Sequence, residues 1–441
     1  MKELKRDDFG AGFELGVATS AYQIEGAYQE DGRGLSIWDV FSHTPGKTRG
    51  GDTGDIACDH YHRYEEDVAL IDWLGVDAYR FSIAWPRVLP EGSGRVNEKG
   101  LDFYDRLVDA LLQKGINPVA TLYHWDLPAA LDGGWLKRET TDAFVEFSVA
   151  AAKRLGDRVT MWFTHNEPWC QAFLGYQKAL FAPGHAAFSE ALLAAHHILL
   201  SHGKAVTALR DEVSAPIGPA LNYTPAYAAT RNLADIAAAV RYDGYFNRWF
   251  LDPIAGRGYP QDIVALYGKQ MPEIPASDME TIAAPIDVMG INYYNRGIFA
   301  NGSDDPILKI RYAPAPGPRT ADREIYPEGI GDTLTRLHRE YGFANLVVTE
   351  NGAAFNEAPA PSGEVLDEGR VAFLKDHLAV VKRVRNQGVP VNAYFTWSLM
   401  DNFEWREGYA LRYGIVHVDF DTLKRTPKKS AHFLRSLSKR T

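Results

Sequence analysis

The hydrophobic and polar positions of the chain repeat one arrangement. An amphipathic segment with helical spacing ends at a glycine, and a short, almost continuous apolar run then stops at polar or aromatic residues. Five copies have their glycines at Gly75, Gly115, Gly156, Gly342 and Gly388. Because glycine adopts the left-handed conformation that ends a helix at little steric cost, each copy predicts a helix that leads into a strand.

The spacing of the copies predicts the number of strands. The first three glycines are 40 and 41 residues apart and the last two are 46 apart, which is room for one strand, one helix and their loops. Three further apolar runs, at 13–20, 216–222 and 287–294, match the strand half and bring the total to eight. Eight buried strands alternating with helices predict a (β/α)8 TIM barrel of the α/β class. The alternative, an open doubly wound sheet, often carries a glycine-rich phosphate motif, and the sequence contains neither G-x-G-x-x-G nor G-x-x-x-x-G-K-[ST].

The same pattern predicts the domain organisation. No Pro/Gly/Ser linker interrupts the chain, so residues 1–441 are predicted to form a single domain with long loops at the C-terminal mouth of the barrel. The segment 296–329, after the sixth strand, is polar and rich in proline, and the segment 32–58 is similar. Long loops in compact domains are usually functional, so we expect 296–329 to form a wall or lid over the mouth.

Composition narrows the classes of partner. The net charge of −10 argues against nucleic acid or an anionic membrane as a partner, since either would require a basic face. The 10 Trp, 22 Tyr and 21 Phe suit a large core and also stacking on the apolar faces of sugars. Only two cysteines are present, Cys58 and Cys170, and the N-terminal residues lack an apolar signal core, so a cytoplasmic location is expected. These features leave homo-oligomerisation open.

Histidines give no support for a metal site. His60 and His62 stand two positions apart without a third ligand, a pattern that is more often structural than metal-binding. We therefore expect neither a metal nor another cofactor.

Polar and aromatic side chains gather at the predicted strand ends, where barrel enzymes place their active sites. In chain order they are Gln23, His124, Trp125, Asn166, Glu167, Asn292, Tyr294, Glu350, Trp397, Glu404 and Trp405. Hydrogen-bonding groups combined with indole rings suit a neutral, polyhydroxylated ring as the ligand.

Two of these residues, Glu167 and Glu350, each end a nearly continuous apolar run. Burying a carboxylate beside an apolar strand costs free energy of folding unless it has a partner or a catalytic role. For a single such carboxylate, a structural salt bridge would be the favoured interpretation. A pair on strands four and seven of eight can flank one small ligand from two sides. Glycoside hydrolysis requires this arrangement, because one carboxyl protonates the leaving oxygen while the other attacks the anomeric carbon or activates water.

Seven motifs resemble those of glycoside hydrolase family 1 and occur in the family's order. They are SAYQIEG at 20–26, RFSIAWP at 80–86, YHWDLP at 123–128, THNEP at 164–168, GINYY at 290–294, VTENG at 348–352 and WSLMDNFEW at 397–405. The resemblance implies a retaining β-glucosidase acting on terminal non-reducing β-D-glucosyl residues, with tolerance for β-galactosides and β-fucosides. It implies Glu350 as nucleophile and Glu167 as acid/base, with carboxyls about 5 to 5.5 Å apart.

The resemblance also implies roles for the other strand-end residues. Arg80 and Tyr294 would hold Glu350 ionised, although an ion pair on the barrel floor explains Arg80 equally well. The resemblance further implies that Gln23 and Glu404, helped by His124 and Trp405, bind the outer hydroxyls of the sugar. Asn166 would bind the 2-hydroxyl, and Trp397 would form the floor on which the sugar ring stacks. Asn292 and Trp125 would also line the pocket. The negative charge of Glu350 is expected to raise the pKa of Glu167, so that Glu167 stays protonated while Glu350 is ionised. A carboxylate at Glu404 disfavours 6-phosphorylated sugars.

Two positions depart from the family's pattern. His165 stands where an apolar residue is common, and strand alternation predicts that it faces the core. Arg323 stands where many members have a tryptophan that walls the leaving-group side. We hypothesise that Arg323 makes this side more polar and weakens the binding of flat aryl aglycones relative to sugar aglycones.

Two other classes of protein fit the sequence less well. A non-catalytic sugar-binding barrel would be marked by loss of Glu167 or Glu350, and both are present. A metal- or cofactor-dependent barrel enzyme, such as an aldolase or an oxidoreductase, would show a lysine or phosphate site at the mouth, and no such motif is found.

Overall fold

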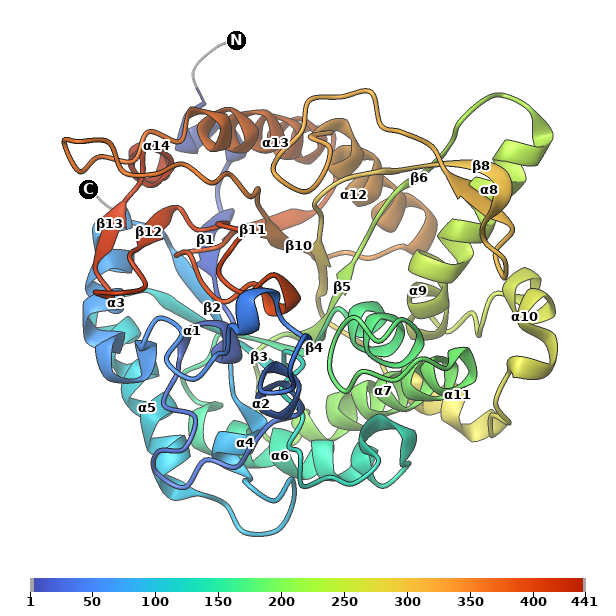
Figure 1. Cartoon of the computed structure of the whole chain (residues 1–441), viewed down its shortest axis with the longest axis horizontal. Helices are drawn as coiled ribbons and strands as arrows, with labels where there is room; N and C mark the ends of the chain where they lie inside the picture. Colours follow the sequence, from blue (N-terminus) through green and yellow to red (C-terminus); the bar gives the residue numbers. More distant parts are fainter. Residues whose placement is uncertain (1–3, 439–441) are drawn as a thin grey trace.

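The computed structural model describes residues 4–438, and its centre is a closed barrel of eight parallel strands (Figure 1). The strands are β1 (Glu14–Ala18), β2 (Ala78–Ser82), β3 (Asn117–Tyr123), β4 (Met161–Asn166), β5 (Ile217–Asn222), β7 (Met289–Asn292), β10 (Leu346–Asn351) and β11 (Val391–Trp397). The ring closes because β1 pairs with both β2 and β11. This arrangement confirms the predicted (β/α)8 barrel and all eight predicted strands.

Helices surround the barrel, and seven of them precede its strands along the chain. These are α3 (His60–Leu74), α5 (Glu98–Gln113), α6 (Thr140–Leu155), α7 (Phe188–Leu209), α11 (Ala276–Ile282), α12 (Glu328–Tyr341) and α13 (Glu368–Asn386). Helix α12 buries Ile330, Leu334 and Leu337, which share one face at helical spacing. The other helices are α1 (Ala21–Ile24), α2 (Ile37–Ser42), α4 (Trp85–Val88), α8 (Leu233–Asp243), α9 (Trp249–Ile254), α10 (Gln261–Tyr267) and α14 (Lys429–Leu437).

Four of the five predicted helix-ending glycines have the expected backbone. Gly75, Gly115, Gly342 and Gly388 have φ between +64° and +93°. Gly156 is different, since its φ is −66° and its conformation is right-handed. Glycine is needed at this position for a steric reason instead, because a Cβ there would lie 2.5 Å from the carbonyl oxygen of Ala152. The prediction of a left-handed residue was therefore wrong at this position.

The segment 296–329 is less irregular than its sequence suggests. It contains β8 (Gly297–Asp305) and β9 (Ile310–Tyr312), which form a three-stranded sheet with β6 (Ala226–Ala228). This sheet lies beside α8 at the edge of the molecule (Figure 1). There Tyr242 of α8 stacks on Phe299 with 3.9 Å between ring centroids. Residues of the segment line the cavity described below, so it forms a wall. A second pair of strands, β12 (Val416–Val418) and β13 (Arg425–Pro427), follows β11.

Side chains fill the interior of the barrel. The inward-facing residues include Ala18, Ala78, Val119, Phe163, Val347 and Phe395, each at most 1% exposed. A packed interior leaves room for a ligand only at an open end of the barrel.

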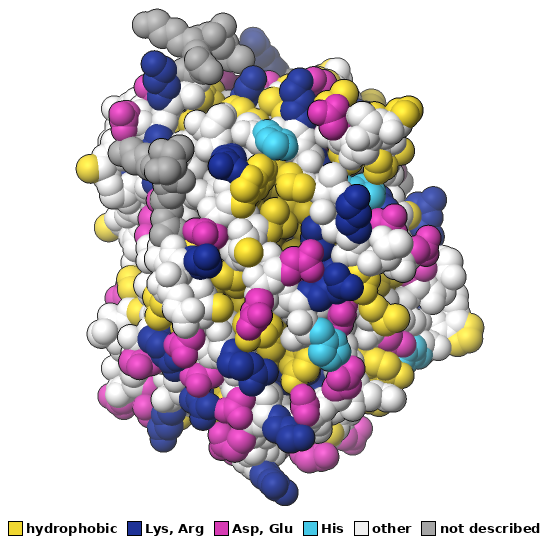
Figure 2. Space-filling model, turned by 90° about the vertical axis from the view of Figure 1, so that its left-hand side faces the viewer, with side chains coloured by type: hydrophobic (Ala, Val, Ile, Leu, Met, Phe, Trp, Pro, Cys, Tyr) yellow, Lys and Arg dark blue, Asp and Glu magenta, His cyan; other side chains and the backbone are white. Residues whose placement is uncertain are grey.

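The surface carries both signs of charge. On the face shown in Figure 2, Lys and Arg side chains are interspersed with Asp and Glu. Within residues 4–438, no helix combines the length and apolar character needed to cross a membrane.

Candidate active site

A cavity of about 750 Å³ opens at the C-terminal mouth of the barrel. The predicted residues that line it are His124, Trp125, Glu167, Asn292, Tyr294, Glu350, Trp397, Glu404 and Trp405. Gln23, Arg80 and Asn166 are at most 1% exposed and contact the lining residues from behind. The structure thus brings the predicted set together around one space.

Glu350 is the penultimate residue of β10, and its side chain accepts two hydrogen bonds. Nη1 of Arg80 donates to Oε1 at 2.8 Å, and the hydroxyl of Tyr294 donates to Oε2 at 2.7 Å. Arg80 is itself held by Thr121, whose hydroxyl accepts from Nε at 3.0 Å, and by the ring of Phe163 below it. A buried guanidinium at this distance stabilises the ionised form of a carboxyl group.

Glu167 follows β4 and has a left-handed backbone with φ of 47°. Non-glycine residues rarely adopt this conformation, and such strain clusters at functional sites. Asn292 donates from Nδ2 to Oε1 at 2.8 Å, and the thiol of Cys170 donates to Oε2 at 3.0 Å. Both donors are neutral. The sequence reading missed Cys170, and the signal available was a thiol three residues after a strand-end glutamate.

Strand register explains why the two carboxyl groups share a cavity. Around the ring, β4 and β10 are separated by β5 and β7. Glu350 pairs with Asn292 of β7, and Asn292 pairs with Asn222 of β5. The amide of Asn292, oriented by the hydroxyl of Thr349 at 2.6 Å, therefore reaches across to Glu167.

Burial raises the pKa of both glutamates. For Glu350, burial is opposed by Arg80 and reinforced by the charge of Glu167. For Glu167, burial is the largest cause, and hydrogen bonds from Cys170 and Asn292 oppose it. Burial is thus the largest cause of the raised pKa of Glu167, and the mutual repulsion of the two carboxyl groups acts on the pair as a whole. The charged donor beside Glu350 favours Glu350 as the ionised member of the pair.

One side of the cavity combines a carboxyl group with indole rings. Gln23 donates from Nε2 to the carbonyl of Phe403 at 2.8 Å and to Glu404 at 3.4 Å. Burial raises the pKa of Glu404 to about 8. Trp397 lies nearly parallel to the imidazole of His124, and Trp405 packs against Trp125 with 4.6 Å between centroids.

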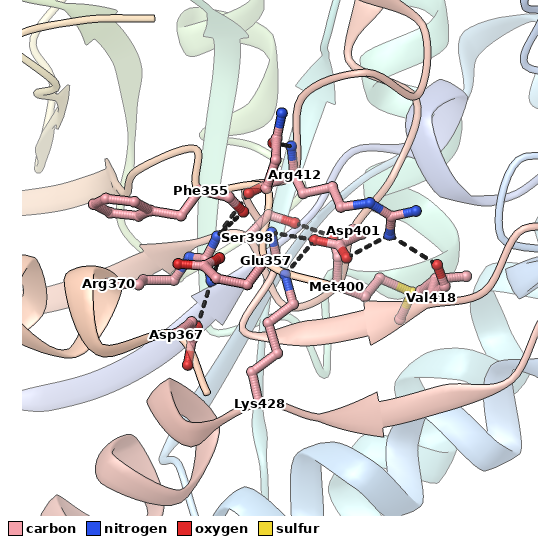
Figure 3. A network of polar contacts seen from close by, with 12 residues as sticks. Phe355, Glu357, Asp367, Arg370, Ser398, Met400, Asp401, Arg412, Val418 and Lys428 are labelled. Carbon is pink, nitrogen blue, oxygen red and sulfur yellow. Dashed lines mark hydrogen bonds and ion pairs between the residues drawn. The ribbon is translucent and has the colours of Figure 1, made fainter. Parts of the chain in front are cut away.

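The segment 398–404, which carries Glu404, is held by a buried ionic cluster. Figure 3 shows Asp401 between Lys428 and Arg412, which donate to its carboxylate at 2.7 and 2.8 Å. The backbone of Gly414 donates to the same carboxylate at 3.0 Å. The cluster joins the end of β11 to residues near the start of α14.

The two departures from the family's pattern have different surroundings. His165 is fully buried away from the cavity, where Nε2 lies 2.8 Å from the hydroxyl of Ser201 and the ring packs 4.4 Å from that of Phe144. Arg323 lines the cavity. His60, the predicted structural histidine, bonds Asp67 at 2.8 Å.

An eight-stranded barrel with two strand-end carboxyl groups, amide donors and indole rings around its C-terminal mouth defines the class of barrel glycoside hydrolases. The model of glycosyl hydrolase family 1 matches residues 5–441, and the chain belongs to this family. It is 47% identical to beta-glucosidase A of Acetivibrio thermocellus and 46% identical to beta-glucosidase A of Thermotoga maritima, over 98% of each chain.

Solved structures agree with this assignment. The family 1 β-glucosidase from Thermotoga maritima superposes with a TM-score of 0.95 at 45% identity, covering 97% of each chain. The AHE enzyme from Alicyclobacillus herbarius superposes with a TM-score of 0.96 at 48% identity, covering 99% of this chain and 98% of its own.

Proposed function

We propose that the chain is a retaining β-glucosidase that hydrolyses terminal, non-reducing β-D-glucosyl residues. The observation that carries this proposal is the unequal surroundings of two carboxyl groups in one cavity. Glu350 accepts from a buried guanidinium, whereas the side-chain donors to Glu167 among residues 4–438 are one amide and one thiol. This inequality suits one ionised and one protonated carboxyl, as glycoside hydrolysis requires.

The reaction then follows a double displacement. The carboxylate of Glu350 attacks the anomeric carbon while Glu167 transfers its proton to the departing glycosidic oxygen, which leaves as an alcohol. Formation of the ester removes the negative charge of Glu350, so Glu167 can take a proton from water. The resulting hydroxide equivalent attacks the anomeric carbon and breaks the ester, which returns Glu350 to its ionised form.

The predicted roles of the surrounding residues complete the site. Arg80 and Tyr294 hold Glu350 ionised, Glu404 with Gln23 and Trp405 clamps the outer hydroxyls, and Trp397 stacks on the ring. Asn166 bonds the 2-hydroxyl, with His124, Trp125 and Asn292 in contact with the sugar. Non-catalytic sugar binding is not favoured, because both glutamates face the cavity.

The relatives support the substrate class. Thermotoga maritima β-glucosidase has been solved in complex with glucoimidazole and with deoxynojirimycin. A relative from Bifidobacterium breve, 43% identical over 97% of each chain, is a bifunctional beta-D-glucosidase/beta-D-fucosidase. We propose cellobiose and other small β-glucosides as substrates, with tolerance for β-galactosides and β-fucosides. The two free, buried cysteines are compatible with a cytoplasmic location.

Azide rescue tests the assignment of both glutamates. Glu350→Gly should lose nearly all activity on 2,4-dinitrophenyl β-glucoside, and added azide should restore turnover with α-glucosyl azide as product, because azide fills the space of the nucleophile. Glu167→Gly should instead yield β-glucosyl azide from the glycosyl-enzyme. Glu364→Gly, at an exposed loop position, should retain activity. Azide products of the opposite configuration, identified by NMR, would reverse the two roles.

A further inference from the structure

One wall of the cavity carries two arginines on one tight turn, and both side chains also reach solvent at the cavity's opening. Arg319 and Arg323 both line the cavity. The backbone amide of Thr320 donates to the carbonyl of Arg323 at 2.9 Å, and the amide of Arg323 donates to the Thr320 hydroxyl at 3.1 Å. Ala321 anchors the turn by donating to the carbonyl of Ala354 at 2.9 Å. The backbone thus holds both arginines in place beside the residues that follow β10.

Arg323 reaches the neighbourhood of the reacting carboxyl groups. Its guanidinium lies 4.7 Å from the ring centroid of Tyr294, whose hydroxyl donates to Glu350. Nε of Arg323 donates to Asp322 at 2.7 Å. Its two terminal nitrogens form no hydrogen bond with any residue between 4 and 438, although the side chain is only 33% exposed. These nitrogens are therefore free to bind a ligand in the cavity.

The acidic side chains of the same wall are already occupied. Asp322 accepts from Arg323, from the Tyr413 hydroxyl at 2.5 Å and from the Thr320 hydroxyl at 2.9 Å. Glu324 accepts twice from Arg296, at 2.9 and 3.0 Å.

Arg319 has no such partner. Over the part of the chain that the structure describes, it makes no ion pair and donates only to the carbonyl of Asp322, at 3.3 Å. The wall therefore holds three arginines against two carboxylates, which leaves one positive charge in excess beside the open donors of Arg323.

We propose that this side of the cavity binds an aglycone that carries a carboxylate. The terminal nitrogens of Arg323 present two parallel donors, which match the two oxygens of a carboxylate, and Arg319 adds a second positive charge. The proposal rests on the β-glucosidase function proposed above and adds the chemical class of the leaving group. Because the reacting glutamates lie beside Tyr294, a carboxylate held by Arg323 orients the glycosidic oxygen toward them.

A pair of synthetic substrates isolates the charge of the aglycone. The kcat/KM for 4-carboxyphenyl β-D-glucoside is divided by that for the neutral 4-carbamoylphenyl β-D-glucoside in each variant, so that general losses of activity cancel. We expect Arg323→Gln to lower this ratio by about tenfold and Arg319→Gln by about threefold relative to the unmodified chain. Arg311→Gln is the matched control, because Arg311 is exposed on β9 and does not line the cavity. Its ratio should stay unchanged.

Salt provides a second readout on the unmodified enzyme. Raising NaCl from about 20 mM to about 0.5 M should lower the ratio, since the screening length falls below about 10 Å. The proposal of an anionic aglycone would be overturned if the ratio were unchanged in both Arg323→Gln and Arg319→Gln, or if it fell equally in Arg311→Gln. Failure to hydrolyse either glucoside would overturn the proposed function itself.

Discussion

At the scale of single residues, the chemistry depends on which hydrogen-bond donor meets which carboxyl group. Glu167 and Glu350 are the same residue type and are both buried. Arg80 makes their surroundings different, because it donates to Glu350 and not to Glu167. Its Nη1 lies 2.8 Å from Glu350, and its Nη2 lies 2.8 Å from Asn166. One fully buried guanidinium thus donates to Glu350 and to Asn166, and within residues 4–438 it forms no hydrogen bond with Glu167.

Cys170 donates to Glu167, the proposed proton donor, and we predict a measurable shift in the pH profile when Cys170 is replaced. A hydrogen bond from the thiol favours the ionised form of Glu167 and so lowers its pKa. In Cys170→Val this donor is lost, the pKa of Glu167 rises, and the alkaline limb of kcat/KM should move to higher pH by roughly half a unit, since a neutral hydrogen bond is worth about 1 kcal/mol.

The matched variant is Cys170→Ser, which keeps a donor at this position. Its alkaline limb should remain within roughly 0.2 unit of that of the unmodified enzyme. The acidic limb, which reports ionisation of Glu350, should stay in place in both variants. A shift of the alkaline limb to lower pH in Cys170→Val would contradict the donor role of the thiol.

At the scale of elements, the segment 398–404 matters because it carries Glu404 into the cavity. It follows β11, and its position depends on residues distant in sequence, chiefly Arg412 and Lys428 around Asp401 (Figure 3). Lys428 is fully buried, and burial lowers its pKa to about 8. The ammonium is stabilised in this setting mainly by Asp401, so the two residues depend on each other.

We predict that Lys428→Met weakens both the fold and sugar binding. Removing one member of a buried ion pair costs about 3–5 kcal/mol when the other charge is left alone, and because Arg412 still donates to Asp401 we expect the lower end, about 3 kcal/mol. The free energy of unfolding, measured with urea, should fall by this amount, and the KM for an aryl β-glucoside should rise severalfold as Glu404 loses its fixed position. Lys424→Met, at an exposed position four residues earlier, should change neither. If Lys428→Met were destabilised but kept an unaltered KM, the ionic cluster around Asp401 would not be what positions Glu404.

At the scale of the whole molecule, the ends of the chain close the barrel. Strand β1, near the first described residue, pairs with β11, and α14 lies beside α3 and α13. Arg385 of α13 donates to the carbonyl of Phe9 at 2.6 Å, and Lys382 pairs with Asp8 at 2.8 Å. We propose on this basis that the chain is a single domain, because its first and last barrel strands pair with each other and α14 packs against the outer helices.

A single domain predicts one cooperative transition in differential scanning calorimetry. Gly16→Val places a side chain where even a Cβ would lie 2.5 Å from the ring of Phe395 and 2.8 Å from the carbonyl of Ala78. Overpacking of this kind costs about 1–3 kcal/mol, and the entire transition should move to lower temperature. Ala344→Val, at an exposed position before β10, should leave it unmoved. Two separate transitions, only one of which moves in Gly16→Val, would argue for two domains.

The sequence by itself determined the barrel, its eight strands and the two glutamates. Each of these depends on short-range signals: apolar runs bounded by helix-ending glycines, and a carboxyl group at the end of a buried strand, as at Glu167 and Glu350. Helix ends such as Gly342 follow from local backbone preference, so they were predictable.

Only the tertiary structure decided how the glutamates differ and what surrounds them. The thiol of Cys170 beside Glu167, the free nitrogens of Arg323 above Tyr294 and the steric need for glycine at position 156 depend on side-chain directions and on close approach between elements. Burial, which raises the pKa of both glutamates, is likewise a property of the assembled wall. Periodicity along a chain specifies which face a residue occupies, whereas distances across a cavity are set only when all the strands have closed into a ring.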